Sequence, residues 1–235
     1  TYMKASDLFV QCLEAEGVER IFGVPGEENA DMMISLMDSN IDFVLCRHEQ
    51  AAAFMADAYG RLTGRAGVCL ATLGPGATNL VTGLADANMD RAPVIAIIGQ
   101  GSTMRLHKES HQIMDSIRMV EPISKWTQTI VAGSNITECV RKAFKIAETE
   151  KPGLCVLELP EDVAKEEVDS MPMVPIKVRR PGADHKAVAS AVELIVNAKQ
   201  PIILAGNGAI RKRAAAQLNR LAQNTGIGVV NTFMG

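Results

Sequence analysis

Two short runs of this sequence combine residue types that could do chemistry. The first places Glu49 between an apolar run, 42–46, and a run of small residues that is typical of a closely packed helix. A carboxylate in such a position suits proton transfer. The second run contains Gly74-Pro75-Gly76, a turn that suits a closely held flat ligand. Each feature alone has an ordinary explanation, because a glutamate also favours a helix start and glycine turns commonly join a strand to a helix. Their order and spacing together indicate one cofactor.

Further turns with polar residues follow other apolar runs. Val24-Pro25-Gly26 follows a short strand, and Gly99-Gln100 ends the most apolar run of the chain. In an open α/β sheet, ligands bind at the carboxyl ends of the strands, so these turns are candidates for the same site. His111 and Gln112 lie in an irregular stretch, 102–125, of the kind that often carries function. His111 could act as an acid or base, or could simply make a loop hydrogen bond.

The elements that must position these residues alternate between helix and strand. This alternation predicts an α/β fold with an open, mainly parallel sheet and helices on both faces. Ser6 is expected to cap the first helix, and Met32, Met33, Leu36 and Met37 are expected to form a core stripe on the second. The expected strands are 20–24, 42–46, 67–72, 93–99 and 154–159, and later helices are expected at 78–88 and 135–149.

Composition restricts the class of protein. Hydrophobic residues make up 47% of the 235 residues, which is enough for a sizeable core. The net charge is -3 without a basic block, so nucleic-acid binding is not expected. No apolar run is long enough to span a bilayer, and no signal core is found at the N-terminus. Five dispersed cysteines without a CxxC motif indicate buried thiols in a reducing compartment, so we expect a cytoplasmic protein without structural zinc.

The charge and proline content changes after the last of these strands. We expect one domain over 1–165, a linker over 166–184 and a second α/β domain over 185–235. The second unit is too short to bury both faces of a sheet, so we infer that the chain is a fragment that ends inside this domain. Its Gly206-Asn207-Gly208 turn is half of a dinucleotide fingerprint, but Arg211 stands where a third glycine would be, which disfavours a nicotinamide dehydrogenase.

Taken together, these runs resemble the pyrimidine-binding domain of thiamine-diphosphate enzymes, and more narrowly the acetolactate synthase large-subunit group. The resemblance covers essentially the whole chain. It rests on residues 22–26, 47–49, 56–61, 74–80, 83–87 and 152–153.

The resemblance implies a role for each site residue. Glu49 would hydrogen-bond a ring nitrogen of the cofactor's aminopyrimidine and so help to activate the thiazolium carbon, while the cofactor performs the covalent chemistry. Gln112 would lie close to cofactor and substrate, so Glu49 and Gln112 are the expected catalytic residues. Cofactor contacts are also expected from Val24, Pro25, Gly26, Gly74, Pro75 and Asn79. In this family Mg²⁺ and the diphosphate bind a separate C-terminal domain, so the fragment alone should be inactive.

The resemblance gives two opposing signals on FAD. The run His111-Gln112-x-Met114-Asp115 is similar to the catabolic, flavin-independent acetolactate synthases, and Lys151 replaces an arginine that is common in flavin-containing relatives. The Gly206-Asn207-Gly208 turn, however, resembles the flavin-type central domain. We expect that FAD does not bind.

The function implied is an acetolactate synthase that decarboxylates pyruvate and condenses it with a second 2-keto acid. The alternatives are a benzoylformate decarboxylase, a glyoxylate carboligase, a sulfoacetaldehyde acetyltransferase or a non-catalytic module of the same fold. Retention of Glu49 argues against the last. The resemblance also implies a homodimer or homotetramer through the pyrimidine-binding domain, and allows a small regulatory subunit.

Overall fold

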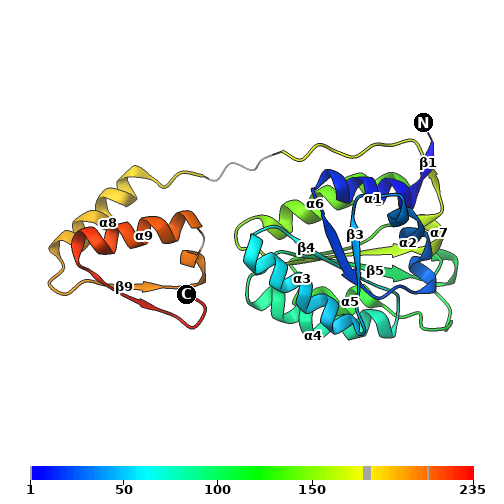
Figure 1. Ribbon diagram of the computed structural model, residues 1–235, viewed down its shortest axis with the longest axis horizontal. Helices are drawn as coiled ribbons and strands as arrows, with labels where there is room; N and C mark the ends of the chain where they lie inside the picture. The colour runs from blue at the N-terminus through cyan, green and yellow to red at the C-terminus, as the bar shows by residue number, and fades with distance from the viewer. Residues whose placement is uncertain (1, 177–180, 211) are drawn as a thin grey trace. The chain divides into compact units, whose positions relative to one another are not determined.

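The computed structural model describes residues 2–176, 181–210 and 212–235. The chain divides into two compact units, 1–177 and 178–235, which Figure 1 shows from the N-terminus in blue to the C-terminus in red. The expected linker, 166–184, includes residues 177–180, which lie outside the described residues. Its first residues belong to the first unit, because strand β8 (Glu167–Val168) pairs antiparallel with β1 (Met3–Lys4). The domain boundaries at 165 and 184 stay a prediction.

The first unit contains a six-stranded parallel sheet in the order β3-β2-β4-β5-β7-β6, which confirms the predicted fold class. Every residue of β5 and of β7 is buried, as expected for central strands that are covered on both faces. The six strands are β2 (Arg20–Gly23), β3 (Asp42–Leu45), β4 (Gly67–Ala71), β5 (Val94–Gln100), β6 (Trp126–Thr129) and β7 (Leu154–Pro160).

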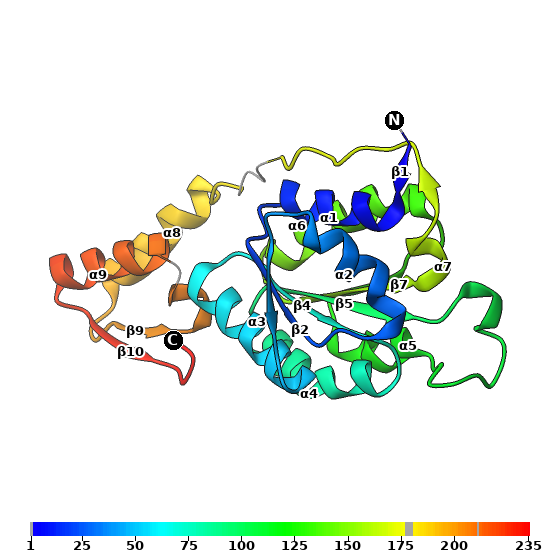
Figure 2. The ribbon, with the colours of Figure 1, turned by 45° about the vertical axis from the view of Figure 1, so that its right-hand side comes forward.

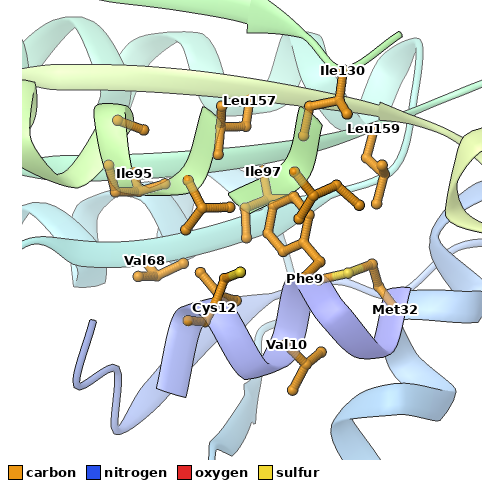
Figure 3. Close-up of a cluster of buried hydrophobic side chains, with 14 of the residues drawn as sticks. Phe9, Val10, Cys12, Met32, Val68, Ile95, Ile97, Ile130, Leu157 and Leu159 are labelled. Carbon is orange, nitrogen blue, oxygen red and sulfur yellow. The ribbon is translucent and has the colours of Figure 1, made fainter. Parts of the chain in front are cut away.

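Helices cover both faces of this sheet, and each face has its own apolar core. Helices α1 and α6 pack against one face, where Phe9 is one of the largest fully buried side chains. Figure 3 shows Phe9 of α1 within this apolar cluster. Helices α3 and α4 pack against the other face through small residues such as Ala53 and Ala77. The helices are α1 (Ala5–Ala15), α2 (Ala30–Met37), α3 (Glu49–Thr63), α4 (Pro75–Met89), α5 (Ser116–Val120), α6 (Ile136–Glu148) and α7 (Glu161–Ala164).

Two local predictions were wrong, and one strand was missed. Helix α1 begins at Ala5 after Lys4, so Ser6 does not cap it and is instead fully buried, where it accepts a hydrogen bond from Ser35 Oγ (2.9 Å). Met37 is 82% exposed, because it ends α2 on the solvent side, and so it is not part of the core. Strand β6 was missed, because its Trp-Thr-Gln-Thr sequence is short, polar and only half-buried at the sheet edge.

The second unit alternates between helix and strand. Helix α8 (His185–Asn197) leads to β9 (Ile202–Ala205), and α9 (Lys212–Thr225) leads to β10 (Gly228–Asn231), which pairs parallel with β9 (Figure 2). Gly206-Asn207-Gly208 forms the turn after β9. Arg211, the position of the missing third glycine, lies outside the described residues. In the described parts of both units, no helix combines the length and the apolar character needed to cross a membrane.

Candidate functional site

The candidate site lies where four parallel strands end. Strands β2, β3, β4 and β5 run in the same direction, so the segments that follow them meet at one edge of the sheet. These segments contain the predicted Val24-Pro25-Gly26, Glu49 and Gly74-Pro75-Gly76, together with the loop that leads to Gln112.

Glu49 is the first residue of α3. Its neighbour His48 caps the helix, since His48 Nδ1 accepts a hydrogen bond from the Gln50 amide (3.1 Å). Glu49 Oε2 accepts a hydrogen bond from Asn79 Nδ2 of α4 (3.0 Å), and Oε1 lies 3.6 Å from the position that a Cβ on Gly76 would take. One oxygen of this half-buried carboxylate is therefore held by Asn79, while the other faces a residue that has no side chain.

Thr72 joins the turn after β2 to the turn after β4. A Cβ on Gly26 would lie 2.6 Å from Thr72 Cβ, and a Cβ on Gly76 would lie 2.9 Å from Thr72 Cγ2. Both glycines are therefore required by close approach. Thr72 Oγ1 also donates a hydrogen bond to Glu28 Oε2 (2.9 Å). Thr72 and Glu28 were not among the predicted site residues. The sequence signal that could have identified them is their position, since Thr72 directly follows β4 and Glu28 lies just after the turn that follows β2.

Gln112 reaches the same edge from the loop that follows β5. Its carbonyl oxygen lies 2.7 Å from the position of a Cβ on Gly74, so a side chain on Gly74 would collide with it. Gln112 has a left-handed backbone, with φ of +57°, and its side chain is exposed. His111 is exposed in the same loop. The structure thus brings Gln112 next to the Gly74 turn.

Five cysteine thiols are free, and burial makes them poor nucleophiles. Burial raises the pKa of Cys12 to about 11 and that of Cys69 to about 12. Cys46, which follows β3 close to Glu49 in the sequence, also has its pKa raised by burial. Thiolate chemistry at this edge of the sheet is therefore not supported.

Carboxylates of the first unit do not gather into a metal site. Among the described residues, no three His, Cys, Asp or Glu side chains are grouped so that they could hold a metal ion. Asp86 and Asp90 instead bind Arg61, at 2.8 Å and 2.6 Å.

Comparison with known proteins places the chain in a family. Residues 3–119 match the family model described as thiamine pyrophosphate enzyme, N-terminal TPP binding domain, and residues 188–235 match the central domain of the same enzymes. The chain belongs to the thiamine pyrophosphate (thiamine diphosphate) enzyme family. Its sheet with strand-end turns is consistent with that assignment.

Several curated relatives are acetolactate synthases. A probable acetolactate synthase large subunit of Methanocaldococcus jannaschii is 42% identical over 99% of this chain and 41% of the relative. A catabolic acetolactate synthase of Raoultella terrigena is 39% identical over 92% of this chain and 39% of the relative. A glyoxylate carboligase of Escherichia coli O157:H7 is 36% identical over 99% of this chain and 40% of the relative. The chain spans about two fifths of the length of the curated relatives it matches.

Proposed function

We propose that this chain forms the pyrimidine-binding half of a thiamine-diphosphate site in an acetolactate synthase. The observation that carries the proposal is the Glu49 carboxylate, with Oε2 held by Asn79 and Oε1 facing Gly76. When bound, thiamine diphosphate supplies the carbanion chemistry that decarboxylates a 2-keto acid. A carboxylate with one fixed and one open oxygen fits the ring nitrogen of an aminopyrimidine.

Each site residue has a distinct part in this proposal. Glu49 Oε1 holds the proton that the ring nitrogen exchanges, and Asn79 keeps the carboxylate in one orientation. Gly26, with Val24 and Pro25, and Gly76, with Gly74 and Pro75, leave room for a flat ring at the strand ends. Gln112 contacts cofactor or substrate from the loop side. We assign Mg²⁺ and the diphosphate to a separate domain, as the family resemblance implies.

The proposed half-site implies an assembly. We propose that a domain of a partner subunit supplies the diphosphate-binding half in a homodimer or homotetramer, with or without a small regulatory subunit. We also propose pyruvate as substrate, the cytoplasm as location and a site free of FAD. The five free cysteines, four of them buried, support a reducing compartment.

The second candidate is a glyoxylate carboligase, because one of the relatives bears that name at 36% identity. No feature of the described residues favours the other carboligases and decarboxylases of the family over these two candidates. A non-catalytic module is disfavoured by the ordered Glu49–Asn79 pair.

The experiment uses the enzyme that carries this chain, with thiamine diphosphate, Mg²⁺ and pyruvate, and with or without FAD. We expect acetolactate to form without FAD, and Glu49→Gln to reduce the rate at least about hundredfold, as for the loss of a general acid–base group. Glu138→Gln is the matched control, because Glu138 is an exposed glutamate in the first turn of α6. Product from glyoxylate alone would favour the second candidate, and an unchanged rate in Glu49→Gln would refute the role of Glu49.

A further inference from the structure

Glu158 on β7 is a buried carboxylate that the proposed chemistry does not use. It is 4% exposed, and the ion pairs of the described residues include none to it. Burial of a charge without a cation is unfavourable unless hydrogen bonds replace water. Glu158 Oε2 accepts one from Thr129 Oγ1 (2.7 Å), and Oε1 accepts one from Gln100 Nε2 (3.0 Å). A buried, costly group of this kind needs an explanation.

Gln100 connects this carboxylate to the loop after β5. The side chain is 2% exposed, and its Nε2 also donates a hydrogen bond to the Met114 carbonyl oxygen (3.0 Å). Its Oε1 accepts a hydrogen bond from the Gly101 amide (2.9 Å). A carboxylate can only accept, so it requires the NH₂ group of Gln100 to face it, and the second hydrogen of that group then reaches Met114. Glu158 thereby determines which way the Gln100 amide lies.

The other end of this loop is held separately. Asp162 of α7 accepts hydrogen bonds from Ser102 Oγ (3.0 Å) and Thr103 Oγ1 (2.6 Å), and Arg105 pairs with Glu161. Residues 106–109 between the two attachments are exposed, and the green segment between β5 and α5 extends from the sheet in Figure 2. The segment between β5 and α5 is therefore a long exposed loop that is held by hydrogen bonds at both ends.

We propose that Gln100, oriented by Glu158, is a positioning residue that fixes the end of the 102–115 loop and thereby holds Gln112 at the candidate site. Met114 is only two residues from Gln112, so the backbone between them spans at most about 7 Å. Release of Met114 would let the Gln112 backbone move away from Gly74, with which it is in close contact. The structural part is independent of the proposed function, whereas the catalytic consequence rests on it.

Gln100→Met is the test variant, and Thr129→Val is its matched control. Each substitution removes one donor to Glu158, but only Gln100→Met removes the attachment at Met114. Hydrogen–deuterium exchange of peptides from 106–115 is measured in the enzyme that carries this chain, with the peptide 94–99 as a reference. We expect about tenfold faster exchange of the loop in Gln100→Met and an unchanged loop in Thr129→Val, as for the loss of one buried hydrogen bond.

Activity separates positioning from a general loss of stability. We expect kcat with pyruvate to fall about tenfold in Gln100→Met and to stay within about twofold in Thr129→Val, since a misplaced active-site group lowers the rate. If Gln100→Met does not fold, Gln100→Asn keeps an amide that is one methylene too short to reach both partners. Equal loop exchange in the test and control variants would overturn the proposal. A wild-type enzyme without product from pyruvate would refute the proposed function only, because loop exchange still decides the attachment.

Discussion

Gly74 and Gly64 both have positive φ angles, of +54° and +71°, but their surroundings differ. A Cβ on Gly74 would meet the carbonyl oxygen of Gln112 at 2.7 Å, whereas nothing lies within 4 Å of a Cβ on Gly64. A residue with a side chain would therefore be strained in its backbone at both positions, but only at Gly74 would its Cβ also collide with another atom. The comparison separates the two effects.

We predict that Gly64→Ala lowers the free energy of unfolding by about 1 kcal/mol, from strain alone. Gly74→Ala should cost about 3 kcal/mol, because overpacking against Gln112 is added to the strain. Urea denaturation of the two variants measures the difference. Equal losses would mean that the Gln112 loop moves aside without cost.

Glu158 provides a prediction about pH. Burial raises its pKa above the ordinary value of 4.5, although hydrogen bonds from Thr129 and Gln100 oppose this and Asp115 adds to it. A raised carboxyl pKa means that the folded state binds the proton more tightly than the unfolded state. This contribution to stability is complete below pH 4.5 and is lost as the pH rises through the pKa of the folded state.

Glu158→Gln removes that dependence, since the amide does not titrate. We predict that the stability of the wild type relative to Glu158→Gln falls as the pH rises from 4.5 toward neutrality. Thermal unfolding of both proteins across this range is the measurement. A difference in Tm that does not change with pH would show that Glu158 titrates alike in the folded and unfolded states.

The helix pair α3–α4 is the element that positions the Glu49–Asn79 hydrogen bond. Arg61 of α3 links the two helices. It forms ion pairs with Asp57 of its own helix (2.7 Å) and with Asp86 and Asp90 at the end of α4. Asp57 is 4% exposed. These ion pairs lie several turns from Glu49, so they stabilise the packing of the two helices without contacting the candidate site.

We predict that Arg61→Met lowers the free energy of unfolding by about 3 kcal/mol, because it leaves the buried Asp57 charge without its partner. The control is Glu19→Gln, which removes the exposed Arg65–Glu19 ion pair (3.5 Å) and should cost less than about 1 kcal/mol. Chemical denaturation compares the two. If Arg61→Met lowers the free energy of unfolding no more than the control does, the ion pairs of Arg61 do not stabilise the helix pair.

The surface of the first unit matters for the proposed assembly. Helix α3 exposes Phe54 (37%), Met55 (43%) and Leu62 (84%), although the same helix is packed against the sheet on its other side. Exposed apolar side chains that gather on one helix are typical of contact surfaces. The homodimer proposed above would cover them.

We predict that Met55→Glu shifts the enzyme that carries this chain toward monomers, because a charge would be buried in the subunit contact. Met37→Glu is the control, since Met37 is also an apolar side chain and is more exposed than Met55 (82% against 43%), but lies on α2, which packs on the opposite face of the sheet. Analytical ultracentrifugation gives the subunit association of both. Dissociation by both variants, or by neither, would contradict a contact through α3.

The sequence by itself determined the fold class and the family. Unbroken apolar runs predicted the central strands, such as β5, because buried parallel strands need apolar residues on both faces. It also placed Glu49 at the start of a helix and Gly74 in a turn, since both are local features of the chain. The roles of these residues at the cofactor stay a prediction.

Only the tertiary structure decided which residues lie together at the strand ends. Asn79 meets Glu49 across 30 residues, and Glu158 meets Gln100 across 58, so no local pattern reveals either pair. The same holds for Ser6, whose hydroxyl is bound by Ser35 instead of capping its helix. The physical reason is that periodicity and capping depend on residues that are neighbours along the chain. A site at the carboxyl ends of the strands is instead assembled from segments that are far apart in sequence and adjacent in space.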